Sequence, residues 1–339
     1  MKILTITILL FIIVLFPGAE SYSQNGNTIT VNGSGFEING NHFEFTGISF
    51  FNALYNPAFN KNSEERRKYI RQYNEYGINV LRIWCQWNNT RGFADSGREM
   101  TLFNQDGSLN SLHLANLKSI IEDADKEGSV ILLVLFSRES WNENLKLDDI
   151  ASDRAVGELT RQLKPYRNLI FQVWNEFNYR TLDYLKIIRN IDDNRLVTNS
   201  PGYAGELGSI EENNALDYLS PHTTRDDERH WEVAAEEVSY LLKKFGKPVV
   251  DDEPARKGTS KYGGPKNPVI PTDQIIHIYN TWKAGGYIIY HHDMFQTGYG
   301  NEAVPVNGIP APGFSSYHDY VFNFLRDRSR YLKNLRHDN

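Results

Sequence analysis

The sequence predicts an α/β fold, a (β/α)8 (TIM) barrel closed at its bottom by a small N-terminal β-hairpin. Beyond residue 43, short apolar segments alternate with amphipathic segments of helical period, and eight such pairs follow one another. The apolar segments are rich in Ile, Val and Leu, as in parallel strands that are buried on both faces. No Gly-x-Gly-x-x-Gly turn follows the first of them, which weakens the alternative of an open doubly wound sheet.

The first 24 residues are expected to lie outside the barrel. Lys2 is followed by an almost unbroken apolar run from Leu4 to Phe16, and then by small and polar residues up to Gln24. This pattern is typical of a cleaved secretory signal. Its apolar core is shorter than the roughly 20 residues that cross a bilayer. We therefore expect a signal at 1–24, a single barrel domain at 25–339, no stable membrane insertion, and a secreted or periplasmic protein.

The positions of the strands and helices can be predicted along the rest of the chain. Asn32-Gly33 and Asn39-Gly40 are turn signals that separate three short strands of the bottom hairpin, at 29–31, 36–38 and 42–45. Barrel strands are expected at 43–51, 78–84, 129–136, 169–174, 195–198, 216–219, 248–251 and 286–290. Helices are expected at 63–76, 112–127, 152–163, 182–191, 231–245, 272–283 and about 317–332, with a weak helix or loop after the fifth strand.

Helix ends are marked by residues with known preferences. Gly77 and Gly128 stop the first two helices, and Ser152 and Thr272 are candidate N-caps of two later ones. A single cysteine permits no intramolecular disulfide, and Cys85 lies in an apolar strand, so it is expected to be an inert buried thiol.

Composition excludes some partners. The formal net charge is −6 and no basic run is present, which argues against nucleic acid. The chain holds 6 Trp and 19 Tyr, a content that suits a carbohydrate-binding surface but also occurs in large secreted folds. The sequence does not indicate an oligomeric state.

Two strands end in an acid. The strand Leu169 to Trp174 runs into Asn175-Glu176, and the strand that starts at Pro248 runs into Glu253. A carboxylate at a buried strand end is costly to desolvate, and barrel active sites form at the C-terminal strand ends. Two such carboxyl groups about 5 Å apart cleave glycosidic bonds with retention, one as acid and one as nucleophile.

Each acid has an alternative reading. Glu176 could be present because the following helix dipole favours a negative charge. Strand alternation would place Asp251 on the same side as Glu253, with Asp252 on the other side, so Asp251 competes for the nucleophile role.

These residues resemble clan A of the retaining glycoside hydrolases, which includes the family-five cellulases and mannanases. The resemblance rests on Trp174-Asn175-Glu176, on Glu253 and on Arg82 at the end of the second strand. It implies that Glu176 is the acid/base and Glu253 the nucleophile. It also implies that Asn175 binds the sugar 2-hydroxyl and that Arg82 steadies the nucleophile. We expect no cofactor and no metal ion to be needed.

The sequence departs from the cellulase-like members at three strand ends. Those members carry a His after strand three, His-x-Tyr after strand six and a Trp after strand eight. The corresponding residues here are Phe136-Ser137-Arg138, His222-Thr223-Thr224 and Tyr290-His291-His292-Asp293. The resemblance therefore implies a sugar-binding subsite that differs from that of a typical cellulase.

Further substrate-binding candidates follow predicted strand ends. His222 could hydrogen-bond the substrate or the nucleophile, or be a structural histidine. His292 is a second candidate, although adjacent His291 and His292 must point opposite ways if the strand continues. Trp84 and Trp141 offer flat faces for sugars, with core packing an equal reading for Trp84.

Four arginines follow strand ends and should share the upper rim: Arg138, Arg180, Arg225 and Arg256. Guanidinium groups bind carboxylates in bidentate fashion, so one hypothesis is a substrate that carries uronic acid or sulfate groups. The alternative is salt bridging with nearby acids, namely Glu139, Asp226, Asp227 and Asp252.

The sequence thus predicts a retaining glycoside hydrolase that cleaves a β-linked poly- or oligosaccharide through a covalent glycosyl-enzyme intermediate. Two other classes stay open. One is a carbohydrate-binding barrel without catalysis. The other is a metal-dependent hydrolase that uses His222, His292 and an Asp, although no Cys/His cluster has ligand spacing.

Overall fold

The structure is a computed structural model that describes residues 26–88, 96–225, 229–254, 270–292, 295, 307–313 and 315–337. The expected signal at 1–24 lies outside these residues, as do Arg256, Asp226, Asp227 and Asp293. No helix of the described part of the chain is both long enough and apolar enough to span a bilayer.

The parallel strands of the predicted barrel are present. Seven of them form one sheet in the order β8-β7-β6-β5-β4-β10-β9. Their bounds are β4 Thr46–Ser49, β5 Val80–Trp84, β6 Val130–Ser137, β7 Leu169–Asn175, β8 Leu196–Thr198, β9 Val250–Asp251 and β10 Tyr287–Tyr290. The longest, β6 and β7, are fully buried and pair from Ile131 with Leu169 to Ser137 with Asn175.

The eighth position of the ring is taken by residues 217–219, between the edge strands β8 and β9. The Asp217 amide donates to the Val197 carbonyl oxygen at 3.0 Å. On the other side the Leu219 amide donates to the Pro248 carbonyl at 3.0 Å, and the Val250 amide donates to the Leu219 carbonyl at 2.8 Å. The predicted sixth strand therefore exists as a short bridge that closes the barrel.

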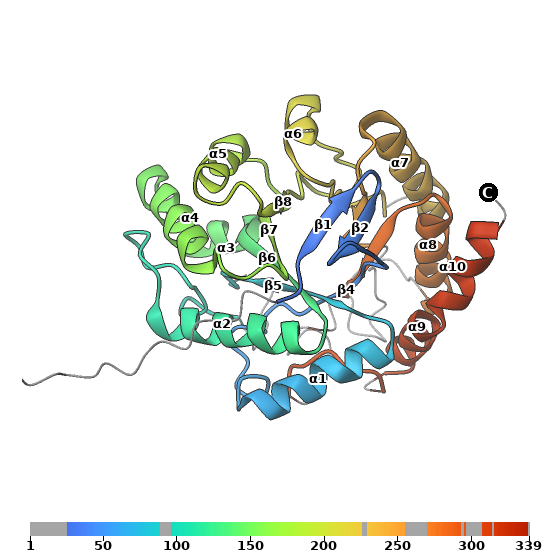
Figure 1. Ribbon diagram of the computed structural model, residues 1–339, viewed down its shortest axis with the longest axis horizontal. Coiled ribbons are helices and arrows are strands. Elements are labelled where there is room, and N and C mark those ends of the chain that lie inside the picture. Colours follow the sequence, from blue (N-terminus) through green and yellow to red (C-terminus); the bar gives the residue numbers. More distant parts are fainter. Residues whose placement is uncertain are drawn as a thin grey trace, which may run out of the picture.

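Helices surround the sheet, and Figure 1 shows them as a ring around the strands. They are α1 Ser63–Glu75, α2 Ser111–Lys126, α3 Arg138–Ser140, α4 Asp149–Leu163, α5 Thr181–Ile191, α6 Ile210–Ala215, α7 His230–Phe245, α8 Pro271–Lys283, α9 Ser316–Arg326 and α10 Arg328–His337, with an irregular turn η1 Trp141–Leu145. Gly77 and Gly128 follow α1 and α2 at φ +72° and +70°, in the left-handed region that a residue without Cβ adopts at little cost.

Some helix ends differ from expectation. Ser152 lies inside α4, and the cap is Asp148, whose Oδ1 accepts from the Ala151 amide at 2.8 Å. Helix α8 begins one residue before Thr272, at Pro271, which suits a first helical position because it lacks an N–H. The expected last helix is two helices, α9 and α10, that meet at Asp327.

The N-terminal hairpin is a three-stranded antiparallel sheet of β1 Ile29–Asn32, β2 Gly35–Ile38 and β3 Asn41–Phe43. Figure 1 shows β1 and β2 in front of the strand ring. Buried Phe36 packs on Phe45, Tyr218 and Tyr287 with ring centroids 4.8 to 5.1 Å apart. The sheet therefore closes the end of the barrel where strands begin, and leaves the opposite end for the site.

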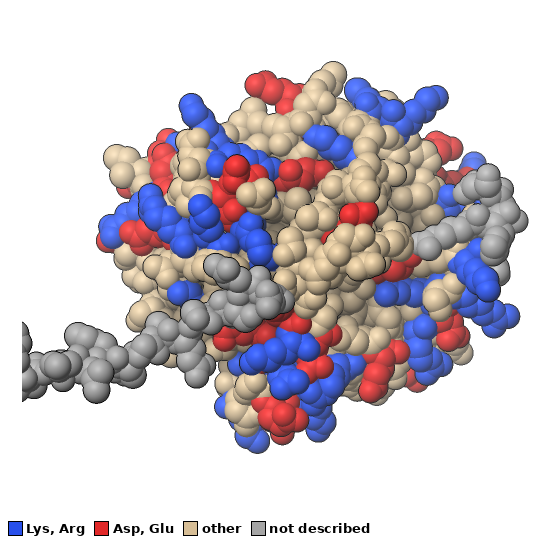
Figure 2. Space-filling model, in the orientation of Figure 1, with Lys and Arg blue, Asp and Glu red and all other residues tan. Residues whose placement is uncertain are grey.

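The charged side chains on the surface are mixed in sign. Lys and Arg lie interspersed with Asp and Glu over the face drawn in Figure 2.

Candidate active site

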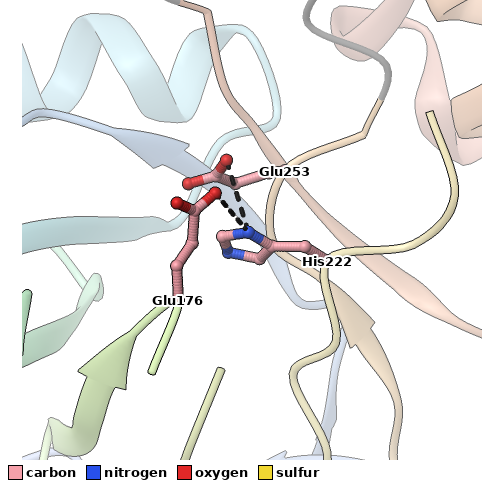
Figure 3. A group of neighbouring side chains, drawn as sticks. All are labelled: Glu176, His222 and Glu253. Carbon is pink, nitrogen blue, oxygen red and sulfur yellow. Dashed lines mark hydrogen bonds and ion pairs between the residues drawn. The ribbon is translucent and has the colours of Figure 1, made fainter. Parts of the chain in front are cut away.

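Two glutamates from opposite sides of the ring meet at the C-terminal strand ends. Glu176 directly follows β7, and Glu253 follows β9 by two residues. One carboxylate oxygen of each, together with one ring nitrogen of His222, lie within 4.8 Å of one another, and all three side chains are buried. Figure 3 shows the three side chains pointing toward one another. The structure thus brings together the two acids that the sequence places 77 residues apart.

The backbone at Glu176 has an unusual conformation, with φ at +56°. A non-glycine residue in this left-handed region costs on the order of 1 kcal/mol or more, and such residues cluster at functional sites. The left-handed turn ends β7, and the Glu176 side chain meets groups from β9 and from the segment after residue 219.

Two cations bridge the pair of glutamates. Arg225 donates from Nη1 to Glu253 Oε2 at 2.7 Å and from Nη2 to Glu176 Oε1 at 2.9 Å. The Nδ1 atom of His222 lies 3.2 Å from Glu176 Oε1 and 3.5 Å from Glu253 Oε2, as the dashed lines of Figure 3 mark. Burial lowers the pKa of His222, but the carboxylates of Glu253 and Asp252 outweigh burial and raise the pKa to about 9.

Arg82 connects the strands beneath the glutamates. It lies on β5, is fully buried, and donates from Nη2 to Asn175 Oδ1 at 2.6 Å. Its Nη1 lies 3.4 Å from Glu253 Oε1, and its Nη2 lies 3.1 Å from Asp252 Oδ2. Gln172, a polar residue within the apolar strand β7, accepts from Arg82 Nε at 2.9 Å and donates to Asp252 at 2.9 Å. Arg82 therefore touches the nucleophile candidate, as the resemblance implies.

The expected alternation after β9 is wrong, because the strand ends at Asp251. Asp252 and Glu253 both contact Arg82. Asp251 instead accepts from Thr223 Oγ1 at 2.6 Å, and its Oδ2 lies 2.7 Å from His277 Nε2 on α8. These contacts draw the Asp251 carboxylate toward the outer helix layer, which favours Glu253 over Asp251 as the nucleophile candidate.

A third carboxyl group stands beside Glu176. Glu139 is partly buried on α3 and shares a hydrogen bond with the Glu176 carboxyl group, and Asn175 Nδ2 lies 3.4 Å from Glu139 Oε2. Burial and the neighbouring carboxylate of Glu176 raise the pKa of Glu139 to about 7. Its neighbour Arg138 donates from Nη2 to Glu176 Oε2 at 3.1 Å, with 39% of its side chain exposed.

The structure separates the two adjacent histidines. His291 Nε2 lies 3.6 Å from Glu253 Oε1, and its Nδ1 is 2.8 Å from Ser49 Oγ. His292, the residue expected to bind substrate, packs against Tyr317 and His318 of α9 with ring centroids 4.8 and 4.9 Å apart. Of these two adjacent histidines, His291 is thus the one that lies beside Glu253, and His292 lies against α9.

Both candidate tryptophan platforms are buried. Trp84 is 1% exposed, packs on Phe51, and has the Arg82 guanidinium carbon 4.6 Å from the centre of its ring. Trp141 is 6% exposed, packs edge-on against Trp174, and donates from Nε1 to Gln86 Oε1 at 3.0 Å. This packing favours core roles for both residues over sugar platforms.

The rim arginines divide into two kinds. Arg138 and Arg225 contact the glutamates directly. Arg180 instead pairs with Asp153 at 2.9 Å and Asp183 at 3.3 Å, away from them. Arg256 lies outside the described residues.

The buried side chains at the site include one set of the metal-ligand type. Glu176, His222 and Glu253 have the spacing of a three-ligand cluster, the one such group among the described residues. However, a guanidinium already bridges the two carboxylates, and an imidazole with a pKa of about 9 carries a proton at neutral pH and offers no free lone pair. His292 is not part of the group. These residues therefore fit an ion-pair network and do not fit a bound metal.

Sequence reasoning did not place Gln172 or His291 in the site. It named Arg225 only as a rim arginine, and Glu139 and Asp252 only as acids that could pair with the rim arginines. Gln172 carried a signal, because a lone amide inside an apolar strand must find a buried partner. The contacts of Glu139 and Arg225 with the glutamates could not be predicted, because both residues lie in segments whose path a strand pattern does not fix.

The comparisons with known proteins concern the family and the barrel fold. The sequence model of the family described as "Cellulase (glycosyl hydrolase family 5)" matches residues 36–230. No curated protein sequence gives a match. A glycoside hydrolase family 5 structure from Bacteroides vulgatus is 16% identical with a TM-score of 0.64, covering 92% of this chain and 71% of that one.

A family 5 mannosidase from Rhizomucor miehei is 14% identical with a TM-score of 0.63, covering 92% of this chain and 99% of that one. A second Bacteroides vulgatus structure is 15% identical with a TM-score of 0.67. The match covers 93% of this chain but only 62% of that one. At such identities these structures establish the barrel fold alone.

Proposed function

The chain belongs to the cellulase family of glycoside hydrolases, glycosyl hydrolase family 5, and from this premise we propose that it cleaves a β-linked poly- or oligosaccharide with retention of configuration. The observation that carries the proposal is that a carboxylate oxygen of Glu176 lies within 4.8 Å of a carboxylate oxygen of Glu253. This spacing suits direct attack by one carboxylate, whereas inverting enzymes leave room for a water molecule between theirs.

In the proposed first step, Glu253 attacks the anomeric carbon and the bond to the leaving oxygen breaks. Glu176 gives its proton to that oxygen, and a covalent glycosyl ester forms on Glu253. In the second step a water molecule gives a proton to Glu176 and attacks the anomeric carbon, and Glu253 leaves as a carboxylate.

The surrounding residues would hold these two groups in place. Arg82 and Arg225 keep a negative charge on Glu253 before attack and after release, because each guanidinium lies within 3.4 Å of one of its oxygens. Glu139, hydrogen-bonded to Glu176, would help to retain the proton that Glu176 must donate. Asn175 remains the candidate for binding the sugar 2-hydroxyl, and Arg82 fixes its amide orientation.

We also propose that residues 1–24 direct export, so that the enzyme meets polysaccharide outside the cytoplasm. Structures similar in fold include a mannosidase and mannanases, and therefore β-mannans belong in a substrate panel beside β-glucans and xylans.

Replacing each glutamate tests the proposal. Glu176→Gln and Glu253→Gln should each lower kcat by several orders of magnitude, because each removes a group that acts in the chemical step. Glu158→Gln is the matched control, since Glu158 pairs with Arg154 on the outer helix α4. Near-native rates in either active-site variant would refute the pair, provided that all three variants keep the melting temperature of the wild type within a few degrees.

The two roles can be separated by chemical rescue. Azide added to Glu253→Ala should restore turnover and give the glycosyl azide of inverted configuration, because azide replaces the missing nucleophile. With Glu176→Ala the azide should attack the glycosyl-enzyme and give the retained product, and proton NMR of the products distinguishes the two. The opposite pattern would exchange the roles.

A further inference from the structure

We propose that the sugar bound at this site carries an acidic group, a carboxylate or a sulfate ester, and that Arg138 and Arg225 bind it. The inference rests on the proposed hydrolase function and adds the chemical class of the substrate. It is carried by the position of the two guanidinium groups and by the charges that surround the glutamates.

Both arginines contact the acid/base candidate. Arg225 donates to Glu176 Oε1 at 2.9 Å, and Arg138 donates to Glu176 Oε2 at 3.1 Å. Arg225 is almost fully buried, whereas 39% of the Arg138 side chain is exposed, more than any other member of this ion-pair network. A group that approaches Glu176 from solvent therefore meets Arg138 first and Arg225 behind it.

The charges of this network become unbalanced when the enzyme is ready to react. Among the described residues, four cations contact it, namely Arg82, Arg138, Arg225 and His222, against the carboxylates of Glu176, Glu253 and Asp252. Glu139, with a pKa of about 7, adds a full negative charge only above neutral pH. Below about pH 7, where Glu139 is itself protonated, the proton that Glu176 takes up leaves two carboxylates, Glu253 and Asp252, against four cations.

Protonation of Glu176 also removes the negative charge that Arg138 contacts, and it leaves Arg225 with Glu253 in place of two carboxylates. A buried excess of positive charge is costly unless it is paired. Hydroxyl groups of a neutral sugar can accept hydrogen bonds from a guanidinium but bring no charge. A carboxylate or sulfate offers both, with the bidentate geometry that guanidinium groups favour.

The other described rim arginine provides an internal control. Arg180 forms ion pairs with Asp153 and Asp183. Within the described part of the chain, it forms no hydrogen bond or ion pair with Glu176 or Glu253. Its charge is already matched by neighbouring acids, so it should not affect which sugar is cleaved.

Matched pairs of oligosaccharides test the inference. A uronic-acid-containing oligosaccharide is compared with its carboxyl-reduced form, and a sulfated one with its desulfated form, so that each pair differs only in the acidic group. Wild-type enzyme, Arg138→Gln and Arg180→Gln are assayed for kcat/KM on both pairs. We expect the acidic member of one pair to be cleaved at least about tenfold faster than its neutral form, as for one charge-assisted hydrogen bond. The pair that shows the difference identifies carboxylate or sulfate.

The variants assign the effect. Arg138→Gln should reduce that ratio about tenfold or more, and Arg180→Gln should leave it unchanged. Equal cleavage of neutral and acidic members by the wild type would overturn the inference and leave the proposed function intact. A ratio that Arg138→Gln does not alter would overturn the role given to Arg138. If no oligosaccharide of any kind is cleaved, the proposed function itself fails, and the inference fails with it.

Discussion

The charge state of His222 is set by the carboxylates that surround it. It is fully buried, yet it lies within 3.5 Å of Glu176, Asp252 and Glu253. Burial alone would make the imidazole neutral, but three carboxylates around one ring favour the imidazolium. His222 thus acts as a second cation beside Arg225 and allows two glutamates to remain close together.

The stability of the protein should therefore decline in alkaline solution. The pKa of His222 rises from 6.5 to about 9 on folding, so its contribution is complete below about pH 6.5 and is lost as pH rises through 9. It amounts to roughly 3 kcal/mol in the free energy of unfolding. Denaturant titrations between pH 7 and 10 should show this fall in the wild type and a flatter profile in His222→Gln.

His42 supplies the control for that measurement, because it lies exposed on β3 beside Glu44. His42→Gln should retain the wild-type pH dependence. An equal alkaline decline in wild type and His222→Gln would show that His222 is not charged in the folded protein.

Glu139 should set the alkaline limb of activity. In the wild type Glu139 and Glu176 form a hydrogen-bonded pair, and the pKa of Glu139 of about 7 marks the pH at which this pair loses its shared proton. In Glu139→Gln no second carboxyl group helps to hold a proton beside Arg138 and Arg225. We expect the alkaline limb of the kcat profile to move to lower pH by about one unit.

The pH optimum of Glu139→Gln, measured beside that of Glu143→Gln on the neighbouring turn η1, checks this expectation. Profiles that coincide with the wild type in both variants would mean that Glu139 has no part in proton transfer. The prediction depends on a residue that the sequence did not single out, since its place beside Glu176 arises from the path of α3.

At the scale of elements, boundary residues explain what could be predicted. The strand β7 was predictable because an apolar run ends abruptly at Asn175-Glu176, and α1 because Gly77 follows it. Strand β9 was harder, because it contains only Val250 and Asp251 and the chain leaves the sheet before Asp252. Alternation is a property of extended strands, so it could not predict the direction of Glu253.

The N-terminal sheet should stabilise the barrel without affecting its chemistry. Phe36→Ala removes a ring that is buried among Phe45, Tyr218 and Tyr287 at the closed end of the barrel. We expect a loss of about 3–5 kcal/mol in the free energy of unfolding, as for other buried Phe→Ala changes. KM and kcat of the folded fraction should remain near wild type, because the site lies at the opposite strand ends.

Glu37→Ala on the same strand is the matched control. The Glu37 side chain is only partly buried, and it accepts a hydrogen bond from Asn32. It should change stability by less than about 1 kcal/mol. A large change of kcat in Phe36→Ala at temperatures where the protein stays folded would show that the two ends of the barrel are coupled.

At the scale of the whole molecule, the fold class was fully predictable and the site only in part. Eight repeats of an apolar and an amphipathic segment specify a barrel, and a barrel specifies the end where strand-terminal acids such as Glu176 and Glu253 gather. Most of the ion-pair network was not predictable, because it combines Arg82 of β5 with side chains from α3 and from the segments after β7, residue 219 and β9, whose paths the barrel does not determine.

Export is a property of the whole chain and is tested on it. We expect expression of the full sequence to give a product outside the cytoplasm whose mass corresponds to loss of about the first 24 residues. A chain that lacks residues 2–24 should remain in the cytoplasm with unchanged kcat/KM. Intact-mass spectrometry of each fraction provides the measurement, and a full-length cytoplasmic product would contradict the proposal.

The short bridge at residues 217–219 has a consequence for how the enzyme fails. Only a few backbone hydrogen bonds join this segment to β8 and β9, whereas β6 and β7 are paired along most of their length. His222 and Arg225 follow the same segment within a few residues. If heating breaks the hydrogen bonds between residues 217–219 and their neighbouring strands, both cations should move away from the glutamates. The enzyme should then lose activity at a lower temperature than that at which the remaining strands unfold.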